Sequence, residues 1–418
     1  MEWKGTSFSE RAALMKKAAA VLRKRKRELA GIAAVEMGKP ITQGMGEVEK
    51  CAWVCDFYAE NAEKFLADEQ IKTESGKVYT KYQPLGVVLA VMPWNFPFWQ
   101  VFRFASPTLM AGNAGLLKHS SNVPGCSLAI QGIFDEAGFP ENVFTSLLID
   151  SESASKLIDA DEVAAVTVTG STEAGARIAE RAGRNIKKCV LELGGSDHFI
   201  VLDDVDVKQC ATFAVQGRIV NSGQSCIAAK RFIVHEKIRK DFEKDFAEHM
   251  KSLKVGDPLD ESTQVGPLAR KDLLDSLLEQ VDKSVRMGAE IATGGNQHGK
   301  KGFFMQPTLV TDVRPGMPVF AEETFGPVAC VVGFKSEDEA VRLANMTEYG
   351  LGASVWSRDV AKAEKLAARI DAGAVFVNKV VASDPRVPFG GIKKSGYGRE
   401  LGRLGILEFM NAKSVVVQ

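Results

Sequence analysis

The stretch GVVLAVM, residues 86–92, is a short and continuously apolar run that stops at Pro93. A strand with one exposed face alternates apolar and polar residues, so an unbroken apolar run is typical of a strand that is buried on both faces. Such strands occur in parallel sheets that carry helices on each side. We therefore interpret residues 86–92 as a buried strand of an α/β domain.

Strand and helix alternate after this run. Helical stretches such as residues 125–137 and 172–182 separate most of the further strand candidates. These candidates are residues 114–118, 143–148, 164–169, 188–191 and 198–202. Two parallel strands joined by a crossover helix form a right-handed unit that covers the sheet. The alternation predicts a doubly wound, Rossmann-like parallel sheet of the dinucleotide-binding type.

A second cycle of strands and helices begins near residue 211. Its strand candidates are residues 231–234, 328–334, 352–356 and 373–378, with helices at residues 238–251 and 336–345 between them. With 418 residues, the chain is also too long for one ordinary core. We expect a dinucleotide-binding domain at residues 1–71 and 86–194, and a second Rossmann-like domain at residues 195–398.

Three segments do not fit either cycle. Residues 9–37 have the apolar stripe of one long amphipathic helix. Residues 77–83 alternate like an exposed strand, and the tail at residues 414–418 is rich in β-branched residues. Because these two strands lie outside the domains, we predict that residues 72–85 and 399–418 form a small β oligomerisation ribbon and a C-terminal tail.

The composition excludes several classes of protein. Basic and acidic residues number 53 each, so the formal net charge is zero, which argues against a nucleic-acid or membrane-surface partner. No apolar run approaches the roughly 20 residues that cross a bilayer, and the N-terminus has no apolar signal core. The seven cysteines are odd in number and scattered, which favours a reducing compartment over a disulfide framework. We expect a cytoplasmic protein.

Cys51 and Cys55 lie four residues apart in a segment that reads as a helix. No second cysteine pair or histidine cluster completes a metal site. The same segment contains Trp53 and Phe57, so we interpret both cysteines as core residues and expect no metal.

Two strand ends offer groups to a nucleotide, although the sequence has neither a Gly-x-Gly-x-x-Gly fingerprint nor a Walker A loop. Gly170 and Ser171 follow the strand at residues 164–169 and open a helix, whose N–H groups favour an anion. Lys118 closes the strand at residues 114–118, where ligands bind in open α/β sheets. An ordinary strand-to-helix turn and a solvated lysine are the alternatives.

Four further segments carry reactive or polar side chains. Asn95 lies between two prolines in PWNFP, directly after the buried strand. Glu192 lies in VLELGG, where an apolar strand end raises the pKa of a carboxyl towards general-base values. Glu323 lies in EETFGP, ahead of a turn. Cys226 follows the flexible turn NSGQS, and this segment alone leaves open whether it is a nucleophile or a buried structural cysteine.

Together these segments strongly resemble the aldehyde dehydrogenase superfamily. The resemblance covers nearly the whole chain and rests on segments that occur in the family's order: PWNFP, the Lys118 strand end, TGSTE, ELGG, GQSC, EETFGPV and PFGGIKKSG. It implies the aldehyde dehydrogenase fold, with residues 195–398 as the catalytic domain. The chain starts almost directly with the long helix, so we expect the first part of the family's N-terminal region to be missing.

The resemblance also implies roles for individual residues. Cys226 would attack the aldehyde as a thiolate, and Asn95 with the Cys226 N–H would hold the oxyanion. After hydride transfer, Glu192 would activate water to hydrolyse the thioester. Glu323 would bind the nicotinamide ribose, with Phe325 beside the ring. The remaining positions implied in cofactor binding are Trp94, Lys118, Ser121, Thr169, Gly170, Ser171 and Leu193.

The cofactor preference is expected to depend on Ser121. NAD-preferring members of the family often place a glutamate three residues after the lysine, and here that position is Ser121. A serine removes the repulsion against a 2′-phosphate, and Ser121 with Lys118 would bind that group. We predict NADP as the preferred cofactor, with residual use of NAD. The alternative is that Ser121 only leaves room and that NAD is still preferred.

The predicted substrate is succinate semialdehyde. Arg103 and Ser383 match the positions at which succinate-semialdehyde dehydrogenases of this family hold the far carboxylate, and arginine can donate two parallel hydrogen bonds to that group. Trp99, Phe102 and Phe389 would form an apolar sleeve. Glutarate semialdehyde and small hydroxyaldehydes such as lactaldehyde are alternative substrates. Arg103 could instead form an ion pair, and Arg218 is a substrate contact or a structural salt bridge.

Other functional classes were weighed against this one. A CoA-acylating dehydrogenase is disfavoured because Glu192 is present. A cysteine hydrolase would need Cys226 beside His235, and a non-catalytic relative would not need the set Asn95, Glu192 and Cys226. The resemblance implies a homodimer or a dimer of dimers.

Overall fold

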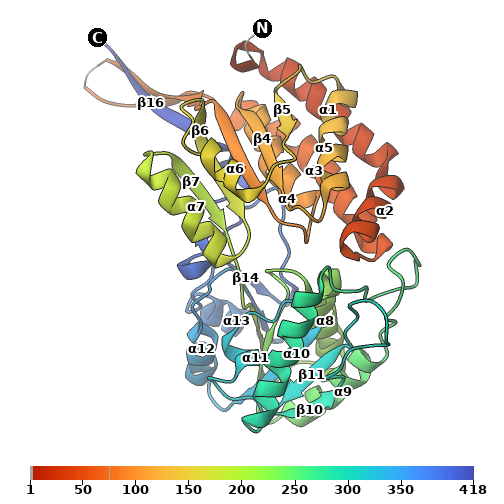
Figure 1. Ribbon diagram of the computed structural model, residues 1–418. Coiled ribbons are helices and arrows are strands. Elements are labelled where there is room, and N and C mark those ends of the chain that lie inside the picture. Colours follow the sequence, from red (N-terminus) through yellow and green to blue (C-terminus); the bar gives the residue numbers. More distant parts are fainter. Residues whose placement is uncertain (1–2, 75) are drawn as a thin grey trace.

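Two parallel sheets and a small antiparallel sheet organise the chain (Figure 1). The computed structural model describes residues 3–74 and 76–418. The first two residues of the expected dinucleotide-binding domain and Ser75 of the expected ribbon therefore lie outside the described residues. The two parallel sheets with helices on both faces and the separate ribbon confirm the predicted fold class.

The first sheet has six strands in the order β15-β7-β6-β3-β4-β5. Their bounds are β3 Val87–Met92, β4 Ala114–His119, β5 Phe144–Ser146, β6 Val163–Thr169, β7 Lys188–Glu192 and β15 Gly396–Tyr397. The apolar run at residues 86–92 is a central strand, paired in parallel with β4 and β6. Only β15 is antiparallel, and it joins this sheet although its residues fall inside the expected catalytic domain.

Helices cover both faces of the first sheet. Helices α4 and α5 pack on one face beneath an outer layer of α1, α2 and α3, and α6 and α7 lie on the other face. The bounds are α1 Phe8–Lys24, α2 Lys26–Met37, α3 Ile41–Phe65, α4 Trp99–Met110, α5 Pro124–Ala137, α6 Ser151–Leu157 and α7 Thr172–Arg184.

The prediction of one helix over residues 9–37 is wrong at one point. The chain bends at Arg25, which separates α1 from α2. The Arg25 guanidinium binds Glu28 in α2 and Glu136 in α5, and α1 and α2 both pack on α3. The apolar stripe runs through the bend, so its periodicity does not reveal it.

The second sheet has seven strands in the order β10-β11-β12-β9-β8-β13-β14. The bounds are β8 His198–Val201, β9 Arg231–His235, β10 Glu290–Thr293, β11 Thr308–Thr311, β12 Val328–Phe334, β13 Gly352–Trp356 and β14 Ala374–Val377. Its helices are α8 Val207–Ile219, α9 Arg239–Lys251, α10 Lys271–Arg286, α11 Pro318–Ala321, α12 Glu337–Asn345 and α13 Val360–Ala367. The sequence did not reveal β10 and β11, which are only four residues each.

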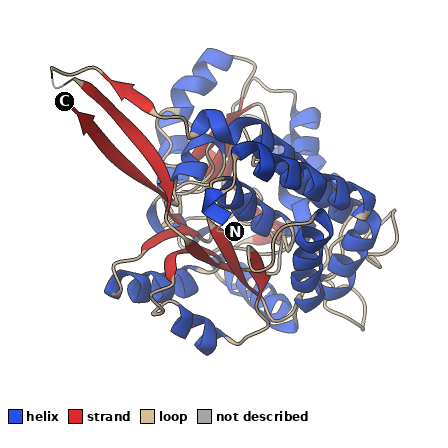
Figure 2. Cartoon of the chain, turned by 90° about the horizontal axis from the view of Figure 1, so that it is seen from above, coloured by secondary structure: helices blue, strands red, loops and turns tan. Residues whose placement is uncertain are grey.

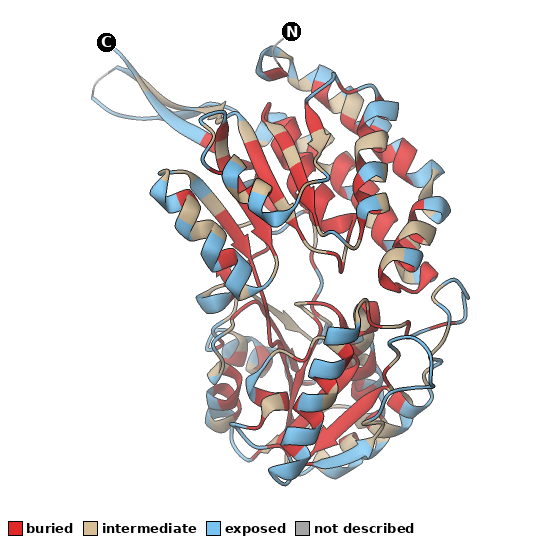
Figure 3. Ribbon diagram, in the orientation of Figure 1, coloured by how far each residue is buried: buried red, intermediate tan, exposed pale blue. Residues whose placement is uncertain are grey.

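The antiparallel ribbon projects from the first domain (Figures 1 and 2). It consists of β1 (Glu69–Ile71), β2 (Lys77–Pro84) and β16 (Met410–Val417). Much of the ribbon is exposed, whereas the strands of both parallel sheets are mostly buried (Figure 3). Ahead of β16, the segment at residues 399–418 also contains α14 (Gly402–Leu407), which packs on α3, where the Tyr58 hydroxyl donates to the Gly402 carbonyl at 2.9 Å.

The core contains Cys51 and Cys55, as the sequence indicated. All seven cysteines are free. Within the residues that the structure describes, no helix combines the length and the apolar character needed to cross a bilayer.

Candidate active site

The turn before Cys226 has a backbone conformation that its sequence explains. Asn221, Ser222 and Gly223 have φ angles of 53°, 55° and 79°, in the left-handed region that most residues avoid. A Cβ on Gly223 would lie 2.2 Å from the Gly326 carbonyl oxygen, so only glycine fits there. This strained turn connects α8 to Cys226, which is partly exposed.

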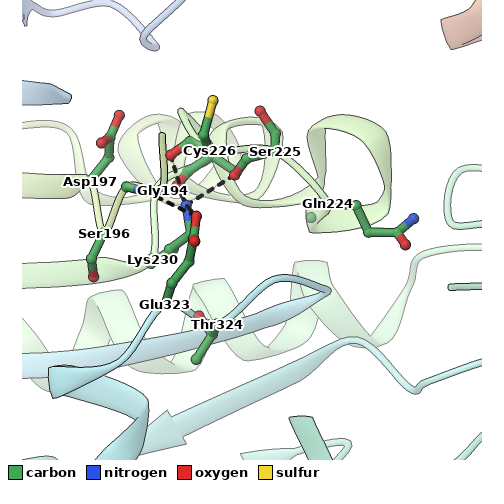
Figure 4. Close-up of polar contacts among 12 residues, drawn as sticks. Gly194, Ser196, Asp197, Gln224, Ser225, Cys226, Lys230, Glu323 and Thr324 are labelled. Carbon is green, nitrogen blue, oxygen red and sulfur yellow. Dashed lines mark hydrogen bonds and ion pairs between the residues drawn. The ribbon is translucent and has the colours of Figure 1, made fainter. Parts of the chain in front are cut away.

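Lys230 lies beneath this turn and is fully buried. Its ammonium donates to the carbonyls of Ser225, Cys226 and Ala228 at 2.9, 2.8 and 3.1 Å. It also lies 3.6 Å from a carboxylate oxygen of Glu323. Figure 4 shows the Cys226 sulfur on the opposite side of its backbone from this ammonium. Sequence reasoning missed Lys230, although a lysine four residues after the cysteine was visible.

Arg218 forms no salt bridge within the described residues. It is fully buried and donates to the carbonyls of Gly223, Ala229 and Thr324 at 2.7, 3.0 and 3.3 Å. Arg218 therefore ties the turn before Cys226 to the segment that carries Glu323.

Asn95 is buried and held at both ends of its amide. Its nitrogen donates to the Gln224 carbonyl at 3.0 Å, and its oxygen accepts from the Gln100 amide at 3.0 Å. Since a carbonyl can only accept, the contact with Gln224 determines which end of the amide is nitrogen. One N–H of that nitrogen is used by Gln224, which leaves the second for a ligand. Gln100 was not among the predicted residues.

One cavity of about 240 Å³ brings most of the predicted nicotinamide and catalytic residues together. The predicted residues that line it are Trp94, Asn95, Thr169, Gly170, Ser171, Leu193, Cys226, Glu323 and Phe325. Trp94 and Phe325 meet edge to face with ring centroids 5.8 Å apart. The Glu323 carboxylate accepts from the Gly195 N–H at 3.1 Å. The arrangement places a thiol, an amide donor and a carboxylate around one flat, partly aromatic space.

A second cavity, of about 260 Å³, lies on the other side of the β6–α7 turn. Its lining includes Lys118, Ser155 and Arg177. Ser171 caps α7 by accepting from the Ala174 N–H at 3.2 Å, and the free N–H groups of that helix end favour an anion. Two cavities flanking a helix N-terminus fit the two halves of a dinucleotide. Ser121 is exposed and does not line the second cavity.

Glu192 ends β7, next to Thr169 in the neighbouring strand, and is 2% exposed. Neither of its carboxylate oxygens has a hydrogen-bond partner within residues 3–74 and 76–418. Gly390 packs directly against it, because a Cβ there would lie 2.7 Å from Oε1. Burial raises the pKa of Glu192 to about 8, against the attraction of Arg103. Glu192 therefore holds a proton at neutral pH and can release it under mildly alkaline conditions.

The thiol of Cys226 does not have the low pKa that a resting thiolate requires. Burial raises the pKa of Cys226 to about 12, although Lys230 and Arg103 act in the opposite direction. The expected attack as a thiolate therefore needs a proton acceptor at the moment of reaction.

The four predicted substrate residues lie around α4 rather than in the nicotinamide cavity. Arg103 is buried, forms an ion pair with Glu400 and donates to the Thr169 hydroxyl at 3.3 Å. Its guanidinium carbon lies 4.7 Å from the Phe389 ring centroid. The ion-pair alternative for Arg103 is thus observed, with a partner that the sequence did not indicate.

Trp99 and Ser383 meet at a residue that the sequence analysis did not consider. The ammonium of Lys50, from α3, donates to the Ser383 hydroxyl at 2.7 Å and lies 4.3 Å from the Trp99 ring centroid. Phe102 instead packs against Phe134 in the core, with centroids 5.3 Å apart, so its place in the apolar sleeve is wrong.

His235 is poorly placed to serve Cys226. Cys226 precedes β9, whereas His235 ends it, and a strand of this length separates its two ends by roughly 13 Å. His235 packs against Phe334. The geometry disfavours a cysteine hydrolase.

The comparison with known families decides the class of the protein. The aldehyde dehydrogenase family matches residues 1–415. The chain belongs to the aldehyde dehydrogenase family. This membership confirms the resemblance that was drawn from the sequence segments.

Two curated aldehyde dehydrogenases and one solved structure are particularly similar to this chain. The probable succinate-semialdehyde dehydrogenase [NADP(+)] of Synechocystis sp. is 53% identical over 408 residues, which cover 98% of this chain and 90% of the relative. The succinate semialdehyde dehydrogenase [NAD(P)+] Sad of Escherichia coli K12 is 46% identical, covering 99% and 90%. The crystal structure of succinic semialdehyde dehydrogenase from Streptococcus pyogenes in complex with NADP+ aligns with a TM-score of 0.97 at 38% identity, covering 99% and 91%.

Proposed function

We propose that this aldehyde dehydrogenase oxidises succinate semialdehyde to succinate with NADP, and accepts NAD less well. The observation that carries the chemistry is that Cys226, Asn95 and Glu323 line one cavity. The substrate and the cofactor are supported by the names of the similar proteins from Synechocystis, Escherichia coli and Streptococcus pyogenes.

In the proposed reaction, the sulfur of Cys226 bonds to the aldehyde carbon and the free N–H of Asn95 stabilises the oxyanion. A donor of this type contributes roughly 3–4 kcal/mol to lowering the barrier. Bound NADP supplies the acceptor for the hydride that leaves the aldehyde carbon. Glu192 is the proposed acceptor for the proton of the thiol, which it passes to solvent before it accepts a proton from the hydrolytic water, since its pKa of about 8 lies close to working pH.

The cofactor would occupy both cavities. We assign the nicotinamide half to Trp94, Thr169, Gly170, Leu193, Glu323 and Phe325, and the adenosine half to Lys118, Ser121 and the Ser171 helix end. The proposal includes the expected division into domains. The dinucleotide-binding domain comprises residues 1–71 and 86–194, the catalytic domain comprises residues 195–398, and the two ribbon segments are residues 72–85 and 399–418. The exposed β strands of the ribbon support a homodimer or a dimer of dimers, and the free cysteines support a cytoplasmic location.

The function is tested by following NADPH formation at 340 nm with succinate semialdehyde. Glutarate semialdehyde, lactaldehyde and the uncharged four-carbon aldehyde butanal serve as competitors, and each is measured with NADP and with NAD. We expect the highest kcat/KM for succinate semialdehyde with NADP, and no turnover in Cys226→Ala. Equal efficiency with butanal would reject the proposed substrate, and a requirement for CoA would indicate acyl transfer instead of hydrolysis.

A further inference from the structure

Lys50 connects the residues that the sequence assigned to substrate binding. It comes from the middle of α3, far in sequence from Trp99 on α4 and from Ser383 in the loop before Phe389. Its ammonium touches both, through the hydrogen bond to the Ser383 hydroxyl and the contact with the Trp99 ring. Burial lowers the pKa of Lys50 to about 8, and repulsion from the like charge of Arg103 adds to this shift. Lys50 thus lies at the centre of this group.

The ammonium of Lys50 has unused binding capacity. It carries three N–H donors, and Ser383 takes one of them while the ring of Trp99 faces the group. No carboxylate forms an ion pair with Lys50 anywhere in residues 3–74 and 76–418. A partly buried lysine in this condition favours an anion that could approach it.

The carboxylates near Lys50 and Arg103 are already bound to other cations. Glu47 pairs with Lys39 and accepts the N–H groups of Phe98 and Trp99, each at 2.9 Å. Asp384 pairs with Arg386 at 2.6 Å. Glu400 pairs with Arg103. After these pairs are formed, one positive charge is left over at the site, on Lys50.

We propose that Lys50 binds the far carboxylate of the substrate, together with Ser383 and Arg103, and thereby determines the preference for a semialdehyde acid over an uncharged aldehyde. This inference rests on the proposed function. The substrate carboxylate would supply the negative charge that the chain does not provide, and the Ser383 hydroxyl would hold the ammonium in position before binding. Trp99 would bound the same site as an apolar wall.

The test compares succinate semialdehyde with butanal, which has the same carbon number and no carboxylate. In Lys50→Met, we expect kcat/KM for succinate semialdehyde to fall about 10- to 100-fold, mainly through KM, as for the loss of a hydrogen bond to a charged group. The value for butanal should stay unchanged. Lys64→Met is the matched control, because Lys64 is exposed on the same helix. It should change neither substrate.

Lys50→Arg provides a second test of the charge at position 50, and this test does not depend on how well the methionine variant folds. It retains the charge and should keep most of the preference for succinate semialdehyde. In the parent enzyme, the ratio of the two kcat/KM values should fall above pH about 8, where Lys50 loses its proton. Cys226 and Glu192 act on both aldehydes, so they cancel in this ratio. Arginine stays protonated, so the fall should disappear in Lys50→Arg.

The alkaline fall has to be assigned against the other groups that face Lys50. These are Arg103 from α4, Glu47 and Cys51 from α3, and Asp384 from the loop. All four are unchanged in Lys50→Arg, so a fall that persists in that variant would overturn the assignment to Lys50.

The outcomes separate the two proposals. If the parent enzyme oxidises butanal as efficiently as succinate semialdehyde, the proposed substrate fails whatever Lys50 does. If the parent enzyme discriminates but Lys50→Met discriminates equally well, the proposed function stands and the role of Lys50 is overturned. A preference lost in Lys50→Met, kept in Lys50→Arg and untouched in Lys64→Met supports the inference.

Discussion

Lys230 and Lys50 serve neighbouring regions of the active site, and their surroundings differ. In the nucleophile loop, residues 221–230, the ammonium of Lys230 is surrounded by three carbonyls and the Glu323 carboxylate. At the carboxylate end, formed by Lys50, Trp99, Arg103 and Ser383, the ammonium of Lys50 has one hydroxyl and one aromatic ring. A cation whose N–H donors are all used stabilises the fold, whereas a cation with unused N–H donors is suited to bind a ligand.

The difference between the regions also concerns what each can recognise. In the proposed reaction, the nucleophile loop would face only the reacting carbonyl and the cofactor, so changes there should affect every aldehyde alike. The carboxylate end lies around α4, and changes there should affect only aldehydes that carry a negative charge. The following predictions test this division, beginning with the largest expected effect.

Lys230→Met should lower the free energy of unfolding by about 3–5 kcal/mol, because it leaves carbonyls and a carboxylate buried without their cation. Urea unfolding followed by far-UV circular dichroism measures this change. Lys50→Met is the matched comparison and should cost about 1 kcal/mol or less, since it removes one hydrogen bond to a hydroxyl. Equal losses in the two variants would remove the distinction between a structural and a ligand-binding lysine.

Asn95→Ala should reduce kcat/KM about 10²- to 10³-fold, because the oxyanion loses a donor. The reduction should be the same for succinate semialdehyde and for butanal, since the reacting carbonyl is identical. Steady-state NADPH formation measures both, and the exposed loop residue Asn296 provides a control in Asn296→Ala. A loss confined to the charged aldehyde would place Asn95 at the carboxylate end and break the comparison.

The rate should depend on the ionisation of Glu192. Burial raises its pKa to about 8, so below that value the carboxyl carries a proton and cannot accept another. We expect kcat to rise about tenfold per pH unit up to pH about 8 and then to level off, for both aldehydes. Glu192→Gln should abolish this rise. A half-maximal rate near pH 4.3, the ordinary pKa of glutamate, would show that burial does not govern the group.

The smallest effect is expected outside both regions, at Ser121. Ser121→Glu should shift the preference from NADP towards NAD by about tenfold, because a carboxylate repels the 2′-phosphate. Ser121→Ala removes the hydroxyl without adding charge and should change the ratio less. The ratio of kcat/KM for the two cofactors measures the shift, and the aldehyde preference should stay constant. If Ser121→Glu leaves the ratio unchanged, Ser121 does not lie near the phosphate, in keeping with its position outside the Lys118 cavity.

The sequence predicted structure best where it depends on consecutive residues. The turn before Cys226 is an example, because its left-handed backbone at Asn221, Ser222 and Gly223 is a local property. The buried strands were equally visible, because a continuous apolar run is also a local property. The short strands β10 and β11 and the bend at Arg25 were missed, because pairing with other strands and ion pairs with distant helices decide them.

The polar side-chain pairs at the carboxylate end could not be predicted from local segments of the sequence. Arg103 was identified, but its partner Glu400 lies nearly three hundred residues further along the chain. Lys50 in α3 and Ser383 in the loop before Phe389 are 333 residues apart and meet only in the folded chain. Side-chain pairs of this kind leave no period or spacing in the sequence, since nothing in a local segment indicates which remote segment will cover it.

By itself, the sequence determined the family and the two sheets and led to Cys226 as the proposed nucleophile, because apolar runs and short motifs are properties of neighbouring residues. Only the tertiary structure decided which charges are neutralised and which are left over. That decision depends on burial, which raises the pKa of Cys226 and of Glu192 and leaves Lys50 without a carboxylate partner in the described chain. Burial is a property of the packed molecule and of no single segment.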